Sequence, residues 1–191
     1  MTPVERQLRA AVEALPTGLA AHVMRVVDEA VRLAALHRIP AQAATIAALG
    51  HDLLRAETSE RLLAIAIAQG YGADDVERME PILLHGPLAV AIMQERFEID
   101  DDDVLGAIAF HTTAHPGMTR LQKLIFIADK IESHKRARAE AVQRVAELAE
   151  RDLDAAMLAY LDHHLVTAAA TGWPLHPRTL VARNELIAAR R

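Results

Sequence analysis

The sequence predicts an all-α protein, a helical bundle followed by a C-terminal helical extension. Three observations lead to this class. Apolar residues make up 52% of the 191 residues while aromatic residues make up only 3%, and the difference is mostly alanine and leucine, which favour helices over sheets. Helix-breaking and capping residues divide the chain into stretches of helical length. No stretch competes with the apolar and polar alternation of a strand.

Prolines, glycines and capping residues mark the expected helix ends in chain order. Pro16 and Gly18 precede the first expected helix, Pro40 precedes the second, and Ser59 begins the third. The acidic run at 100–103 lacks the glycine and terminal glutamate of an EF-hand loop, so we expect it to cap a helix. The expected helices span residues 19–37, 41–54, 59–69, 74–84, 87–97, 101–112, 119–133, 137–171 with a break, and 178–190.

The chain is expected to form a single domain over residues 1–191. Its length is at the upper end of one ordinary domain and suffices for a sizeable core. No fixed-period repeat, low-complexity tract or Gly/Ser linker marks a boundary. The helices over about 137–191 are interpreted as an appendage that docks on the core or on a second copy of the chain. Between these we favour a homodimer.

Composition narrows the function classes. A formal net charge of -5 provides no broad basic surface for a nucleic-acid polymer or an anionic membrane. The absence of cysteine excludes disulfides and thiolate chemistry, so a metal would need His, Asp, Glu or backbone oxygen ligands. The amino terminus is charged where a signal peptide is apolar, and no apolar run approaches the roughly 18 residues of a membrane span. We therefore expect a cytoplasmic protein.

Several polar residues fall on the apolar faces or at the ends of expected helices. Helical periodicity places His22, His111 and Asp129 each among apolar positions of its own helix. His51 and Asp52 close the second expected helix. A lone inward histidine is more often a hydrogen-bonded core residue than a ligand, and a lone inward aspartate can be part of a structural ion pair.

A shared metal centre explains these residues together. So many buried polar groups are hard to stabilise without a cation. Four imidazoles and two carboxylates suit two divalent metals, and a carboxylate such as Asp52 can bridge them. Two metals can lower the pKa of a bridging water and offset phosphoryl charge, which indicates phosphoester or phosphoanhydride hydrolysis. The expected ligands are His22, His51, Asp52, His85, His111 and Asp129.

The order of these residues resembles the H...HD...D signature of the HD-domain phosphohydrolase superfamily. The segments LLHGPLAVAI, AIAFHTTAHPGM and LQKLIFIADKIE are similar to those of the YqeK-type HD proteins, the symmetrical diadenosine tetraphosphatases of bacteria. The closing segment GWPLHPRTLVARNEL resembles that of the same family. The resemblance covers roughly residues 19–187 and implies an HD-domain helical bundle with its core over about 19–134.

The resemblance also implies an activity. It indicates symmetrical cleavage of diadenosine tetraphosphate to two ADP, with a metal-activated hydroxide attacking phosphorus. The cofactor implied is a pair of divalent metal ions, iron first, with manganese, zinc, nickel or magnesium as alternatives. The six residues listed above match the ligand positions of the family. Asp52 is assigned a catalytic role, as is Arg55, which stands where family members usually carry lysine.

Basic residues near these positions are candidate phosphate contacts, because a tetraphosphate carries several charges that two metals do not wholly offset. For each of them a solvated surface charge is the alternative. His163 and His164 are interpreted as surface or packing residues, and no side chain is assigned to adenine recognition. The candidate phosphate contacts are Arg25, Arg55, Lys130, Lys135 and Arg136.

Two other functions remain open from the sequence. One is an HD-type nucleoside monophosphate phosphatase. The other is a non-catalytic nucleotide-binding or signalling module that keeps the helical core and the metal. The altered basic positions leave the second alternative open, since this chain has Lys135 where the family has arginine and Arg55 where it has lysine. In every case the expected partner is a nucleotide or dinucleotide.

Overall fold

The computed structural model describes residues 1–136 and 139–190, and all regular elements within them are helical, which confirms the all-α prediction. The α-helices are α1 (Pro3–Glu13), α2 (Thr17–His37), α3 (Ala41–Gly50), α4 (Ser59–Ala68), α5 (Asp75–Met79), α6 (His85–Phe97), α7 (Asp102–Phe110), α8 (Arg120–Ile131), α9 (Ser133–Arg136), α10 (Glu140–Ala149), α11 (Leu153–Thr171) and α12 (Pro177–Ala188), and a 3-10 helix, η1, spans Pro81–Leu84.

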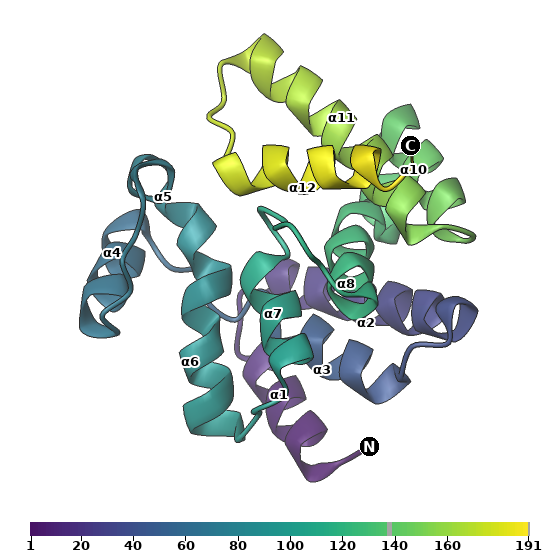
Figure 1. Ribbon diagram of the computed structural model, residues 1–191. Coiled ribbons are helices and arrows are strands. Elements are labelled where there is room, and N and C mark those ends of the chain that lie inside the picture. Colours follow the sequence, from purple (N-terminus) through teal and green to yellow (C-terminus); the bar gives the residue numbers. More distant parts are fainter. Residues whose placement is uncertain (137–138, 191) are drawn as a thin grey trace.

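The core lies where α2, α3, α7 and α8 pack against one another (Figure 1). Each of these helices turns an apolar stripe inward, as residues three and four apart share a face. Leu33 of α2, Ala47 of α3, Ile108 of α7 and Ile125 of α8 are fully buried. Burial of a side chain of the size of leucine or isoleucine stabilises the fold by about 1.5–3 kcal/mol. The packing of these four helices therefore positions everything attached to their ends.

One helix, α1, lies in a segment where no helix was expected. Its start has a local explanation: the Thr2 side chain accepts a hydrogen bond from the Glu5 backbone N–H, and Pro3 occupies the first turn, where a missing N–H costs nothing. Leu8 and Val12, four residues apart, are both buried. The helix packs on α3 and α2 and so covers part of the core (Figure 1).

Several expected helices differ in their bounds. The helix expected over 74–84 is interrupted at Glu80, whose φ of -126° and ψ of 74° are not helical, because the next residue is Pro81 and a residue before proline disfavours the α region. The helix expected over 41–54 ends at Gly50, and α6 begins at His85, two residues before its expected start at 87. Asp101 caps α7 by accepting from two backbone N–H groups, as expected of the acidic run.

The break expected within 137–171 lies between α10 and α11. Asp152 caps α11 by accepting from the backbone N–H groups of Asp154 and Ala155. Residues 137 and 138, the expected start of this segment, lie outside the described residues. Both α10 and α11 pack on α8, and α12 packs on α11, so these helices cover one side of the core (Figure 1).

A buried polar link joins α12 to α5. His176 Nε2 lies 2.8 Å from Asp74 Oδ2, and the Tyr71 hydroxyl donates to Glu77 Oε1 over 2.9 Å. His176 and Glu77 are almost fully buried. Because the Nδ1 of His176 accepts the Arg178 backbone N–H, its hydrogen sits on Nε2 and faces the carboxylate. The link therefore fixes the start of α12 against the start of α5.

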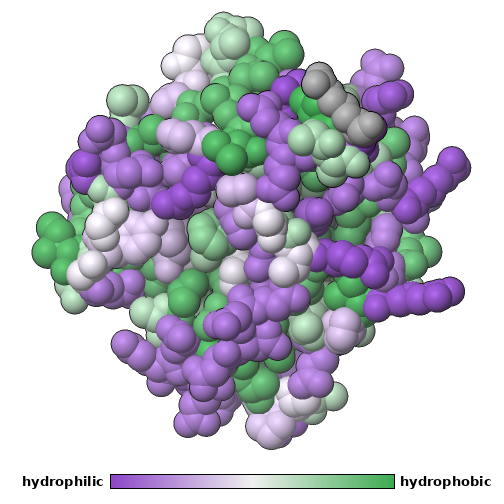
Figure 2. Space-filling view, in the orientation of Figure 1, coloured by the Kyte–Doolittle hydropathy of each residue, from purple (hydrophilic) through white to green (hydrophobic). Residues whose placement is uncertain are grey.

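The surface gives two further observations. Figure 2 shows hydrophilic and hydrophobic side chains interspersed over one face of the molecule. Within the part of the chain that the structure describes, no helix combines the length and the apolar character that crossing a bilayer requires.

Candidate metal centre

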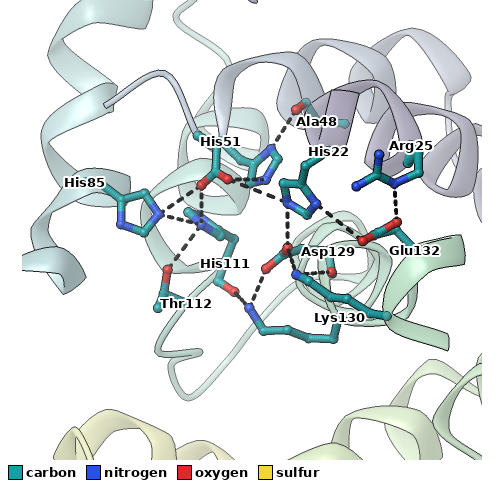
Figure 3. A network of polar contacts seen from close by, with 12 residues as sticks. His22, Arg25, Ala48, His51, His85, His111, Thr112, Asp129, Lys130 and Glu132 are labelled. Carbon is teal, nitrogen blue, oxygen red and sulfur yellow. Dashed lines mark hydrogen bonds and ion pairs between the residues drawn. The ribbon is translucent and has the colours of Figure 1, made fainter. Parts of the chain in front are cut away.

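Six side chains that are far apart in the sequence converge at the ends of the core helices (Figure 3). They are held by α2, by the turn that follows α3, by the first residue of α6, by the residue that follows α7, and by the last turns of α8. The convergence has a simple cause, because the second turn of α2, the ends of α3, α7 and α8 and the start of α6 lie near one another. The six are His22, His51, Asp52, His85, His111 and Asp129.

The carboxylate of Asp52 lies at the middle of this cluster and separates the imidazoles into two pairs. Its Oδ2 is 3.6 Å from His22 Nε2 and 3.4 Å from His51 Nε2. Its Oδ1 is 3.1 Å from His85 Nε2 and 3.6 Å from His111 Nε2. A carboxylate whose two oxygens face different pairs of nitrogen ligands has the arrangement needed to bridge two cations.

Backbone carbonyls determine which ring nitrogen carries the hydrogen in three of the histidines. A carbonyl oxygen only accepts, so a ring nitrogen in contact with one must be the N–H, and the other nitrogen is left with a free electron pair. His51, His85 and His111 all use Nδ1 in this way, each toward the carbonyl three residues earlier: Ala48 at 2.7 Å, Ile82, and Ile108 at 2.7 Å. All three Nε2 atoms therefore point their electron pairs into the cluster.

One of these electron pairs has a hydroxyl donor, since Thr112 Oγ1 lies 3.1 Å from His111 Nε2. His51 Nε2 is buried and makes no hydrogen bond, although Asp52 Oδ2 lies 3.4 Å away. His85 Nε2 and His111 Nε2 lie 2.9 Å apart. Two acceptors at this separation repel each other unless they share positive charge, either a proton or a cation. Backbone carbonyls that accept from the other ring nitrogen and so orient the imidazole are a regular property of metal-binding histidines, so the residues present fit a metal centre.

Asp129 completes the cluster on the side of α8. Its Oδ1 lies 3.2 Å from His22 Nε2. The ammonium groups of Lys130 and Lys135 both pair with the same carboxylate, the second at 2.7 Å from Oδ1. Asp129 is thus shared between an imidazole of the cluster and two cationic side chains.

Glu132 is a member of this site that sequence reasoning missed. Its side chain is almost fully buried, and its Oε1 lies 3.6 Å from His22 Nδ1. The Arg25 Nε donates to the Oε2 of the same carboxylate over 2.6 Å. Glu132 therefore orients His22 so that the other ring nitrogen faces Asp52 and Asp129. The available signal was its spacing, three residues after Asp129 and so on the same helical side.

The pKa values show that the cluster attracts positive charge. Burial alone would raise the pKa of Asp52, but His51, His111 and His85 hold it well below its ordinary range. Burial would also raise the pKa of Asp129, and Lys130, His22 and Lys135 hold it well below that range. Burial lowers the pKa of His111 to about 4 against the pull of Asp52, with His85 and His51 adding to the decrease. Two carboxylates thus stay ionised beside a neutral imidazole.

Three groups of ligand atoms lie close enough to hold a metal ion among the described residues. Two of them share His51: one adds His22 and Asp129, the other adds Asp52 and His111, and within each group the atoms lie within 4.8 Å of one another. The third group is Asp74, Glu77 and His176. In this group His176 Nδ1 accepts the Arg178 backbone N–H, and the buried Nε2, which makes no hydrogen bond, lies 2.8 Å from Asp74 Oδ2, so we interpret the group as an ion pair between α12 and the start of α5.

A cavity of about 920 Å³ opens onto the cluster. Arg55, Lys130 and Lys135, three of the expected phosphate contacts, line this cavity, and Arg55 is exposed. Arg25 is not part of the lining, and its guanidinium pairs with Glu132 instead. The side chain of Arg136 lies outside what the structure describes, so its role stays a prediction. The size of the cavity suits a ligand of nucleotide dimensions.

The cavity is also lined by residues to which the sequence analysis gave no functional role. Tyr160, His163 and His164 of α11 line the cavity. The interpretation of the two histidines as surface or packing residues is therefore incomplete, because α11 folds back over the core and turns them toward the cluster. Sequence periodicity alone does not show which helix faces which cavity.

The family follows from comparison with known proteins. A family model described as HD domain matches residues 19–134. This chain therefore belongs to the HD domain family, and the resemblance seen in its motifs is confirmed. All six clustered side chains lie within the matched residues.

Individual relatives are similar over most of the chain. A symmetrical bis(5′-nucleosyl)-tetraphosphatase of Halalkalibacterium halodurans is 32% identical over 166 residues, 87% of this chain and 87% of that protein. The symmetrical bis(5′-nucleosyl)-tetraphosphatase of Bacillus subtilis is 31% identical over 166 residues, 87% of this chain and 88% of that protein. A crystal structure of a predicted HD superfamily hydrolase involved in NAD metabolism, from Clostridium acetobutylicum, has a TM-score of 0.91 at 34% sequence identity and covers 96% of this chain and 97% of that one.

Proposed function

We propose that this protein is a metal-dependent phosphohydrolase that cleaves diadenosine tetraphosphate symmetrically into two ADP. In this reaction water adds to one of the two inner phosphorus atoms and the bond from that atom to the central bridging oxygen breaks, so that each half leaves as ADP. The support from comparison is that relatives 31–32% identical over 87% of this chain are symmetrical bis(5′-nucleosyl)-tetraphosphatases.

One observation carries the chemical part of the proposal. The two oxygens of Asp52 face two separate pairs of imidazole nitrogens at 3.1–3.6 Å. We infer that His22, His51, Asp52 and Asp129 hold one divalent cation and that Asp52, His85 and His111 hold the second. Two such cations, when bound, supply Lewis acidity that lowers the pKa of a water molecule and charge that offsets the phosphates.

The side chains of the chain itself then have distinct roles. Asp52 stays ionised between the imidazole pairs, and backbone carbonyls that accept from Nδ1 of His51, His85 and His111 turn the Nε2 atoms of these rings toward it. Arg55, which lines the cavity and forms no ion pair among the described residues, is the guanidinium available to a phosphate oxygen. Lys130 and Lys135 pair with Asp129, and a cation on that carboxylate would compete with them and free the ammonium groups for phosphate.

The metal we propose is iron. The donor set of imidazole and carboxylate without thiolate suits iron and equally suits manganese, zinc or nickel, with magnesium the least favoured by nitrogen ligands. The preference for iron comes from the resemblance to the YqeK-type proteins. Elemental analysis of protein purified under anaerobic conditions identifies the metal directly.

The proposal is tested with a panel of substrates. Metal-loaded protein incubated with diadenosine tetraphosphate should yield ADP as the sole nucleotide product. ATP with AMP would indicate asymmetric cleavage, deoxyadenosine from dAMP would indicate a monophosphatase, and tight binding without products would indicate a non-catalytic module. A generic phosphodiester completes the panel.

A matched pair of variants links the activity to the cluster. Asp52→Asn removes the bridging charge and should lower kcat by at least about 100-fold, because an amide does not replace a carboxylate between two cations. Asp102→Asn makes the same change at an exposed position in α7 and should leave kcat unchanged. An active Asp52→Asn variant with an unchanged metal content would refute the dinuclear assignment.

Three broader expectations remain proposals of the same kind. We propose that residues 1–191 form one domain, with a core over about 19–134 and C-terminal helices over about 137–191. We also propose a homodimer and a cytoplasmic location.

A further inference from the structure

One face of α11 forms a wall of the cavity that opens onto the candidate metal centre. The four residues on this face, Tyr160, His163, His164 and Thr167, are spaced as residues on one side of a helix must be. All four lie outside residues 19–134, the part that matches the HD domain. The wall is therefore an addition of the C-terminal helices to the core, and the cluster of ligands does not use it.

The wall presents flat rings in a chain that has few of them. Only six residues of the chain are Phe, Tyr or Trp, and Tyr160 alone among the described ones lines the cavity. Its ring lies edge-on to Phe126 with centroids 5.5 Å apart, which holds it in place. The His164 ring is almost parallel to it, with an interplanar angle of 12° and centroids 6.0 Å apart. Two rings thus lie in one orientation along the cavity.

The pKa values of both rings are shifted toward the uncharged form. Burial raises the pKa of Tyr160 to about 12, with Asp129 adding to the rise. Burial lowers the pKa of His164, and the neighbouring Lys130 and His163 lower it further. Asp162, which precedes His163 in α11, pairs with Arg183 of α12. The α11 side of the cavity is thus lined by rings, and Lys130 lies beside it.

The rings and the cationic side chains meet at Lys130. Its Nζ pairs with Asp129 and lies 6.0 Å from the centroid of the Tyr160 ring. The cavity therefore offers cationic side chains that suit phosphate and, on α11, rings that suit a flat group. A nucleotide has the same division, with its phosphates at one end and its base at the other.

We propose that this face of α11 is the nucleobase-binding wall of the cavity, with the rings of His164 and Tyr160 providing the stacking surface and His163 providing a hydrogen-bonding group. The proposal rests on the proposed function for the nucleotide nature of the substrate. It assigns one adenine of the dinucleotide to α11, a helix beyond the HD core. Stacking of this kind tolerates different bases, since every base has a flat face.

Binding of two ligands to the full-length, manganese-loaded protein tests the wall. ADP carries a base, and inorganic pyrophosphate carries only the charged part. Calorimetric titration should show that His164→Ala weakens ADP binding about 10-fold and changes pyrophosphate binding less than 2-fold. His164→Phe keeps a flat ring and should restore most of the ADP affinity. Val166→Ala, at an exposed position of the same helix, is the matched control and should change neither.

The outcomes separate this proposal from the proposed function. If His164→Ala loses the same affinity for ADP and for pyrophosphate, or binds ADP as the wild type does, the nucleobase-binding role of α11 is refuted. This holds even if the wild-type protein cleaves diadenosine tetraphosphate. A wild-type protein that neither cleaves that substrate nor binds ADP would overturn both proposals. Circular dichroism shows whether His164→Ala folds. If it does not, His164→Phe is compared with the wild-type protein instead. A loss of ADP binding in a folded His164→Phe variant would refute stacking.

Discussion

Asp52 and Asp129 are the two buried carboxylates of the candidate centre, and their neighbours differ. Asp52 is surrounded by imidazoles alone, so both of its oxygens face groups that can share a metal with it. Asp129 faces one imidazole of the cluster and two ammonium groups. A divalent cation at Asp129 must therefore compete with lysine for the same oxygens, whereas a cation at Asp52 has no such competitor among the described side chains.

Removal of one ammonium should shift this competition. Lys135→Met keeps most of the aliphatic stem but removes the positive charge that lies 2.7 Å from Asp129 Oδ1. We expect the affinity for manganese to rise several-fold, because a cation within hydrogen-bond distance opposes the binding of another. The KM for diadenosine tetraphosphate should rise as well, since a phosphate contact is lost. Metal titration and steady-state kinetics measure the two effects.

The control for this variant is Lys123→Met, which removes an ammonium paired with Asp154 away from the cavity. Neither metal affinity nor KM should change in it. A Lys135→Met protein with lower metal affinity would show that the ammonium supports the centre rather than competing with the cation.

At the scale of elements, the centre is assembled from helix ends. The start of α6 lies against the end of α7, and this contact brings His85 to His111. Gly86 permits the contact, because a Cβ at this position would lie 2.8 Å from the Ile108 carbonyl oxygen and 2.9 Å from that of Ala109. Both are backbone atoms of a packed helix, which cannot move aside as a flexible side chain can.

The variant Gly86→Ala should therefore push α6 away from α7. We expect a loss of about 1–3 kcal/mol in the free energy of unfolding from overpacking, measured by urea denaturation. We also expect the affinity for manganese to fall about 10-fold or more, as happens when the geometry around metal ligands is disturbed. Gly72→Ala, at a position where an added Cβ meets nothing within 4 Å, is the control. Full metal affinity in Gly86→Ala would mean that His85 does not need this close contact.

At the scale of the whole molecule, the candidate centre lowers the stability of the fold that contains it. Buried carboxylates and converging imidazole electron pairs are costly to bring out of water, and a core of packed helices must offset that cost. A ligand that binds the folded state alone adds to stability by mass action. Metal binding should consequently be visible as global stabilisation and not only as activity.

Thermal unfolding checks this expectation. Protein freed of metal with a chelator should melt at a lower temperature than protein with manganese, and free metal at 100 times its Kd should add about 2.7 kcal/mol to the free energy of unfolding. Asp52→Asn should melt at the same temperature with or without the metal. A wild-type melting temperature that does not respond to manganese, iron or zinc would contradict the centre as a whole.

Much of the fold and of the cluster could be predicted because the signals are local. The period of apolar residues together with caps such as Thr58 and Asp101 predicted most helices, and the same period turned His22, His111 and Asp129 inward. The segment of α1 carried comparable signals in Thr2 and Pro3 that were not used. Glu132 was missed as a site residue because its spacing from Asp129 alone does not distinguish a buried glutamate from a solvated one.

The sequence by itself determined the helical class and which side chains with metal-binding chemistry lie on inward faces, because helical periodicity and the order of motifs are properties of neighbouring residues. Only the tertiary structure decided which oxygen of Asp52 faces which imidazoles, that Lys130 and Lys135 pair with Asp129, and that α11 closes the cavity. Those arrangements depend on how helices far apart in the chain pack against one another, and no local pattern encodes that packing.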